Sequence, residues 1–222
     1  MLKLFKADLL DIIPVETGFI YACREFDGTN DTAGFFNYDM TADVFERISI
    51  TDYIAEKFGS EGFDLARSLG DFVTCTLRGL SPTANIASYN DGTIKIYDNN
   101  GFITDTKKVR YMNMPARSPE PVGRDLWMTV PEANAVINYS LKYDRIEFRI
   151  GGPTEKAFSH PASLSLYDGR LYVCNENSFS IKTIDLDTYK VSGFYVFNEP
   201  VSKYFRVSGS EFAVLRSGVY KL

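Results

Sequence analysis

The sequence has one histidine and three cysteines in 222 residues, and these low counts exclude several kinds of site. The single histidine, His160, rules out metal centres that need two or three imidazole ligands and leaves one candidate base for a Ser-His-Asp triad. Cys23, Cys75 and Cys174 are an odd number with no CxxC pair, which excludes a disulfide framework and a zinc knuckle. We interpret the three cysteines as small buried hydrophobic residues.

Long apolar runs and dense basic clusters are also lacking. No apolar stretch reaches the length of a membrane-spanning helix, and residues 1–8 do not contain a signal-peptide core. The formal net charge of -5 and the pI near 5.0 argue against non-specific binding to nucleic acid or to an anionic membrane. We therefore expect a cytoplasmic protein that has neither nucleic acid nor membrane as a partner.

What the sequence does contain is a repeated four-residue apolar pattern. Its last residue stands at positions 23, 75, 129, 174 and 215, a spacing of about 40 to 55 residues. A strand that recurs at such a period is typical of a β-propeller, in which each blade is an antiparallel sheet of four strands. We assign the five copies to the second strand of each blade: residues 20–23, 72–75, 126–129, 171–174 and 212–215.

Weaker patterns on either side of each copy predict the remaining strands. First strands are expected upstream, at residues 10–13, 65–69, 163–167 and 204–207, with an irregular segment at 117–123 in the third blade. Third strands end in Asp, Asn or Ser, residues that favour a turn. The turn leads into a fourth strand, which mostly alternates apolar and polar residues, at 44–48, 93–97, 146–150 and 191–196.

The two ends of the chain together supply the strands of the fifth blade in this scheme. The fifth repeat stops after residues 217–222, which match a third strand, whereas residues 2–6 alternate like a fourth strand. We expect these segments to pair and close the ring, because closure removes two exposed sheet edges. The prediction is an all-β, five-bladed propeller that forms a single domain over residues 1–222.

Two insertions account for the longer spacing of the first repeats. Residues 51–59 have the pattern of a short helix, and residues 99–115 contain a further extended segment. Both insertions fall between a fourth strand and the next first strand, on the face that also carries the loops joining second and third strands. We predict that Tyr53, Phe58 and Phe102 are exposed there and contact a partner.

The same face carries the candidate ligand-binding residues, because function in radial folds usually lies in the loops at the mouth of the channel. Polar residues follow the second strands and His160 precedes a first strand, so the candidates are Glu25, Arg78, Glu132, Asn134, His160, Asn175, Glu176 and Arg216. Carboxylates and amides from different blades could converge on a cation such as calcium or on a sugar. The alternative is structural, since strands commonly end in polar residues where their loops contact water.

One blade carries a family resemblance. Residues 161–173 (PASLSLYDGRLYV), followed by residues 184–188 (IDLDT), resemble repeats of the NHL and gluconolactonase-like propeller superfamily. Propellers of that superfamily usually have six or seven blades, whereas this chain predicts five. The resemblance implies a divalent cation in the channel of the gluconolactonase-like enzymes, but their ligands have no residue-by-residue match in this sequence.

The motif content favours binding over catalysis. No GxSxG elbow, HExxH, P-loop or GxGxxG sequence is present. The leading hypothesis is a non-enzymatic binding module without a cofactor that recognises a protein partner or a small ligand on the loop-rich face. The alternative is a lactonase-like or glycosidase-like hydrolase at the channel mouth, with or without a metal, that uses Glu25, Glu132, Glu176 or His160.

Overall fold

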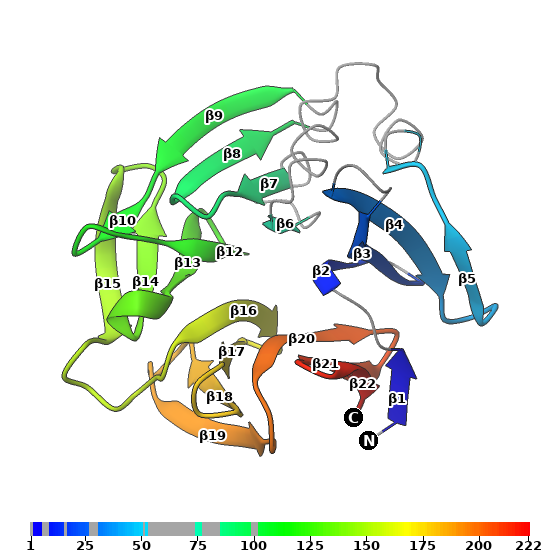
Figure 1. Cartoon of the computed structure of the whole chain (residues 1–222). Coiled ribbons are helices and arrows are strands. Elements are labelled where there is room, and N and C mark those ends of the chain that lie inside the picture. Colours follow the sequence, from blue (N-terminus) through cyan, green and yellow to red (C-terminus); the bar gives the residue numbers. More distant parts are fainter. Residues whose placement is uncertain are drawn as a thin grey trace.

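The computed structural model describes residues 2–5, 9–15, 17–26, 31–50, 52, 74–76, 85–98 and 102–222. Their strands form five four-stranded antiparallel sheets, arranged as blades around a common centre (Figure 1). The predicted all-β, five-bladed propeller is therefore confirmed.

Four blades follow the chain from the inner to the outer strand, and three of them have the predicted strands. Blade one consists of β2 (Leu9–Pro14), β3 (Gly18–Phe26), β4 (Asp31–Asp39) and β5 (Val44–Arg47). Blade three consists of β12 (Arg117–Val122), β13 (Asp125–Val130), β14 (Ala135–Ser140) and β15 (Arg145–Gly151). Blade four consists of β16 (Pro161–Tyr167), β17 (Arg170–Asn175), β18 (Ser180–Asp185) and β19 (Val191–Val196). The first strands β12, β16 and β20 contact one another in turn, which places them on the inside of the ring.

Blade five closes the ring as predicted. It combines β20 (Val201–Val207), β21 (Ser210–Leu215) and β22 (Gly218–Lys221) with the N-terminal strand β1 (Leu2–Phe5). Strand β1 pairs antiparallel with β22, with Leu2 opposite Lys221 and Lys3 opposite Tyr220. Both ends of the described chain thus lie in one sheet (Figure 1).

Blade two differs from the prediction by one strand. Its sheet consists of β6 (Thr74–Thr76), β7 (Asn85–Ser88), β8 (Thr93–Tyr97) and β9 (Ile103–Lys108). Strand β12 of blade three contacts both β6 and β7, just as β16 contacts β12 and β13, so β6 is a first strand. Assigning residues 72–75 to a second strand and 93–97 to a fourth strand was therefore wrong. First and second strands of a propeller are both covered on two faces, so their apolar patterns are alike.

The corrected assignment makes the repeat more regular. The second strands of the last four blades end about 40 to 45 residues apart, at Ser88, Val130, Asn175 and Leu215. The extended segment that was predicted to be an insertion is instead the outer strand β9. After β9 the chain forms a small hairpin of β10 (Arg110–Tyr111) and β11 (Met114–Pro115).

Helices contribute little to the described structure. The predicted first strand at 65–69 and, apart from Asp52, the predicted helix at 51–59 lie outside the described residues. A single turn of 3-10 helix, η1 (Pro131–Ala133), joins β13 to β14. In the part of the chain that the structure describes, no helix has the length and apolar character that crossing a bilayer requires.

The core consists of layers between neighbouring blades, and this arrangement explains the apolar repeat. In β13, Leu126 and Met128 are fully buried in the layer that also contains Ile86 and Ile94 of blade two. Trp127 points the other way, into the layer shared with Leu171 and Val173 of blade four. A second strand is therefore buried on both faces and appears as a continuous apolar run instead of an alternating one. Trp127 is only 4% exposed, as a core residue should be.

The inner strands are joined edge to edge by side chains. Ser118 Oγ and Glu120 Oε1 of β12 accept hydrogen bonds from the backbone N–H groups of Leu164 and Leu166 in β16, at 3.2 and 3.1 Å. The hydroxyl of Tyr167 in β16 accepts the backbone N–H of Arg206 in β20 at 2.8 Å. Buried strand edges need partners for their backbone donors, and the preceding blade supplies them here.

Burial makes Cys174 chemically inert, as expected for a packing residue. The side chain lies in the layer between blades four and five, is fully buried, and burial raises the pKa of its thiol to about 12. Because the thiolate is the reactive form, iodoacetamide at pH 8 should label Cys174 at least about 100-fold more slowly in the folded protein than in 6 M guanidinium. Peptide mass spectrometry checks this, and equal labelling rates would contradict the burial.

Candidate functional site

One face of the propeller brings together two kinds of segment, namely the turns between second and third strands and the connections from one blade to the next. Val109 N–H donates to Gly92 O at 2.9 Å in blade two, and Arg216 N–H donates to Pro200 O at 3.0 Å in blade five. In blade three, His160 N–H donates to Asn134 Oδ1 at 2.7 Å. These contacts across three blade junctions show that the turns and the connections share a face.

Two of the candidate residues, Asn134 and Asn175, hold the connection between blades three and four in place. Asn134 caps η1 in the left-handed conformation, with φ of 52°, and its side chain accepts the N–H of His160. Asn175 is fully buried; its Oδ1 accepts the N–H of Ser159 at 3.0 Å and its amide donates to Val173 O at 3.0 Å. Both amides bond to the backbone and anchor residues 152–160.

The candidate carboxylates pair with basic residues of their own blades. Glu132 Oε1 accepts from Arg117 Nη2 at 2.8 Å, and Glu176 Oε2 lies 2.9 Å from His160 Nδ1. Each pair joins a residue shortly after a second strand to a residue at, or just before, the start of the first strand of the same blade. Their side chains are 33 to 39% exposed, so each pair contributes only modestly to stability. Among the described residues there is no group of three or more His, Cys, Asp or Glu suited to a metal ion.

The remaining candidates are placed as follows. Glu25 lies within β3, opposite Thr32, so its assignment to a loop after that strand was wrong. Arg216 is an exposed residue in the turn between β21 and β22. Phe102 is 49% exposed, but it precedes β9 and lies in the turn between third and fourth strands, on the opposite face from the one predicted. Arg78, Tyr53 and Phe58 lie outside the described residues.

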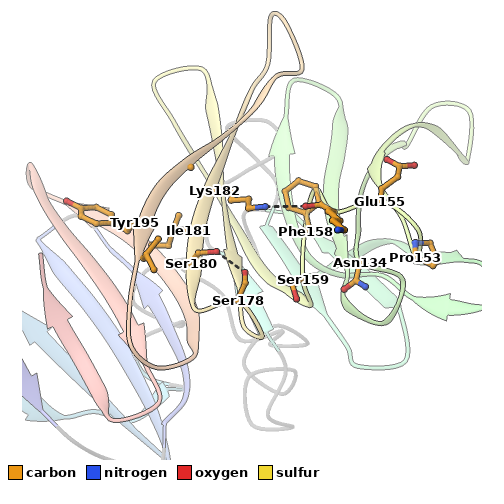
Figure 2. Close-up of a pocket in the computed structure, with 13 residues that line it drawn as sticks. Asn134, Pro153, Glu155, Phe158, Ser159, Ser178, Ser180, Ile181, Lys182 and Tyr195 are labelled. Atoms are coloured by element: carbon orange, nitrogen blue, oxygen red, sulfur yellow. Dashed lines mark hydrogen bonds between the residues drawn. The ribbon is translucent and has the colours of Figure 1, made fainter.

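A groove opens beside the anchored connection, between blades three and four. It encloses about 510 Å³ and is lined by the connection on one side and by the outer half of blade four on the other (Figure 2). The buried ring of Phe158 contributes an apolar floor. Hydroxyls of Ser178 and Ser180, 2.9 Å apart, stand on the blade-four side. Of the predicted candidates, Asn134 is the one that lines this groove.

The charges of the groove are mainly positive, against the negative charge of the whole chain. Lys182 Nζ donates to Ala157 O at 2.6 Å and fixes the connection from the blade-four side (Figure 2). Lys156 is exposed at the rim. Glu155, the acidic residue of the lining, pairs with Arg149 at 2.6 Å. Two ammonium groups therefore remain to attract an acidic ligand.

The sequence alone did not identify the groove residues on blade four. Lys182 lies inside a third strand and Gly193 inside a fourth strand, whereas the candidates were sought only at strand ends. The available signal was Gly193, since a glycine in a strand interior often marks a bulge or a site that a ligand or another backbone approaches closely. In the structure it lies opposite Lys182. A Cβ added at Gly193 meets no atom within 4 Å.

Comparison of the sequence with protein-family models and with curated proteins finds no match. Among solved structures, the fold is similar to the WD40 β-propeller domain of Doa1, with 10% identity and a TM-score of 0.57 over 99% of this chain and 93% of that one. The computationally designed Ika4 protein gives 13% identity and a TM-score of 0.48 over 64% of this chain and 86% of its own. Kuenenia stuttgartiensis hydrazine synthase has 14% sequence identity and a TM-score of 0.49, over 62% of this chain and 40% of its own. The similarity to the Doa1 domain supports the propeller fold independently, whereas the NHL and gluconolactonase-like superfamily is not confirmed.

Proposed function

We propose that this protein is a non-enzymatic β-propeller interaction module that binds a segment of a protein partner in the groove between blades three and four. The observation that carries the proposal is a solvent-open groove with an apolar floor, two hydroxyls and two ammonium groups, held open by an anchored connection. Apolar surface provides affinity and a few placed polar groups provide orientation, which is the usual composition of a recognition site.

The arrangement of the carboxylates supports binding in preference to hydrolysis. Retaining and inverting glycosidases need two carboxyl groups facing one reacting bond. Instead, Glu132 pairs with Arg117 in blade three and Glu176 pairs with His160 in blade four. No observation in the described residues favours the hydrolase alternative or its divalent cation, and both stay untested predictions.

The proposal is tested by filling the groove. Ser178 is exposed in the turn between β17 and β18 and lines the groove, so Ser178→Trp adds bulk there without disturbing the core. A heptapeptide library displayed on phage, selected on the wild-type protein, should yield peptides that bind Ser178→Trp at least about tenfold more weakly, a loss of about 1.4 kcal/mol. Fluorescence anisotropy with the synthetic peptides measures the change.

The matched control is Lys190→Trp, an equally exposed position at the opposite end of the same blade, in the turn between β18 and β19. Peptide affinity should be unchanged in this variant. Selected peptides that bind Ser178→Trp as tightly as the wild type, or a selection that yields no specific peptide, would contradict the groove as the binding site.

A further inference from the structure

Strand β19 differs from every other outermost strand of the ring. The outer strands β1, β5, β9 and β15 each contain charged residues, whereas β19 (VSGFYV) contains none. Natural proteins protect exposed strand edges with charges, proline or a covering segment. In the described structure β19 is the edge of its sheet, and Phe194, Tyr195 and Val196 are 39, 36 and 81% exposed.

The free edge of β19 offers backbone hydrogen-bonding groups beside the groove. Phe197 N–H donates inward to Phe179 O at 2.7 Å, and Val196 is paired with Ser180. The pairing of β18 with β19 has a register shift at Phe194, and beyond it inward and outward groups alternate along the strand. The N–H and C=O of Val196 therefore point away from β18. Val196 also lines the groove, so the strand edge and the groove form one continuous surface.

The two faces of β19 have different chemistry. On the face toward blade three, Gly193 lies opposite Lys182, and the ammonium groups of Lys182 and Lys156 lie at the groove. On the face toward blade five, the ring of Phe194 lies 5.0 Å from that of Tyr172 and 4.5 Å from that of Tyr195. One face is therefore basic and open, and the other is aromatic.

From these features we infer that an extended segment of the protein partner adds to β19 as a fifth strand of blade four, with side chains that alternate between acidic and apolar. Side chains of such a strand point alternately to the two faces of the sheet. Acidic residues then approach Lys156 and Lys182, and apolar residues cover Phe194 and Tyr195. The inference rests on the proposed function and names the class of segment that the groove recognises. Backbone hydrogen bonds supply affinity and the alternating side chains supply specificity.

The size of the surface favours a peptide segment over a second copy of this chain. Stable interfaces between folded proteins bury about 1,200 to 2,000 Å² in total. Strand β19 is six residues long, and three of its side chains carry its exposed large apolar surface. A strand of this length matches a short extended peptide, which binds through its backbone and needs no second folded surface.

The inference is tested with three fluorescein-labelled octapeptides. One alternates valine and glutamate, the second alternates valine and lysine, and the third is the valine-glutamate peptide with N-methylated backbone at every second residue. The valine-glutamate peptide should bind at least about tenfold more tightly than either of the others, because only it supplies both the charges and the backbone donors. Equal binding of the glutamate and lysine peptides, or of the N-methylated peptide, would overturn the inference.

Variants of β19 locate the binding. Val196→Pro removes one outward N–H and no hydrogen bond of the existing sheet, so it should weaken binding of the valine-glutamate peptide at least about tenfold. Val196→Thr keeps the edge and should bind as the wild type does. Binding that is lost in Ser178→Trp but unchanged in Val196→Pro would overturn strand addition while leaving the groove function intact.

A separate measurement distinguishes the second-copy occupant. Sedimentation of the wild-type protein at about 100 µM should show a monomer. A dimer that Val196→Pro abolishes would overturn the peptide segment in favour of pairing between two copies of β19.

Discussion

Replacement of Arg206 by methionine should lower the free energy of unfolding by about 3 kcal/mol, which corresponds to a fall in Tm of about 10 °C for a domain of this size. Arg206 in β20 joins blades four and five. Its Nη1 bonds to Asp168 at 2.7 Å, its Nη2 to Glu211 at 2.8 Å, and its Nε to Tyr204 OH at 2.7 Å. The methyl thioether fills similar space but leaves the carboxylate of Glu211, which is 28% exposed, without its cation. Asp168 is 81% exposed, so water replaces most of its interaction with Arg206.

Aromatic rings surround the same guanidinium and add to the expected effect. Its Cζ lies 5.3 Å from the ring centroid of Tyr167, 5.0 Å from that of Tyr172 and 5.8 Å from that of Tyr204. Cation–π contacts of this kind contribute about 0.5 to 2 kcal/mol and are strongest where solvent is excluded. The Arg206 side chain is 23% exposed, so solvent screens the contacts only partly.

Thermal and urea denaturation, followed by circular dichroism, measure the change. Arg206→Lys keeps the charge but loses the planar, multidentate geometry, and we expect an intermediate loss. The control is Arg124→Ala, at an exposed arginine in the turn between β12 and β13, which should change stability by less than about 0.5 kcal/mol. A methionine variant as stable as that control would show that Arg206 does not hold the two blades together.

Removal of strand β1, by deletion of residues 1–6, should destabilise the protein by at least about 3 kcal/mol and promote aggregation. The strand is the outermost member of blade five and pairs with β22, so its loss exposes a new edge and opens the closed ring. Differential scanning calorimetry and light scattering report the two effects. Because the lost strand is a local segment, a synthetic peptide of residues 1–8 should partly restore the Tm when added in excess.

A control peptide with the same composition in scrambled order separates specific pairing from general stabilisation. It should leave the Tm of the deletion variant unchanged. A deletion variant that melts at the temperature of the full chain and does not aggregate would contradict closure of the ring through β1.

Much of the fold was predictable because the signals are local and repeated. A second strand such as β13 is covered on both faces by neighbouring blades, so Leu126, Trp127 and Met128 are apolar without interruption. Every blade packs between two neighbours in the same way, so the apolar pattern recurs once per blade. The errors of strand assignment lie in blade two, where the first strand at 74–76 has the same pattern as a second strand.

For the candidate site, the sequence predicted only the face of the propeller. Asn134, His160, Asn175 and Glu176 were predicted only to share a face, because strand order fixes which loops lie together, and the structure places them around the connection at 152–160. Their roles did not follow from residue type. The two asparagines satisfy backbone N–H groups 16 to 26 residues away, and such partners are set by how blades pack against each other.

By itself, the sequence determined the number of blades, the β-structure and the closure of the ring. Burial on two faces makes an inner strand apolar throughout, and exposure on one face makes an outer strand alternate apolar and polar residues, so both patterns are visible in short segments. The tertiary structure decided which polar groups anchor the connection at 152–160 and which remain to face a ligand. It also decided that Lys182, Gly193 and Val196, from the interiors and ends of β18 and β19, line a single groove. That juxtaposition depends on the packing of blade four against blade three, which no local pattern encodes.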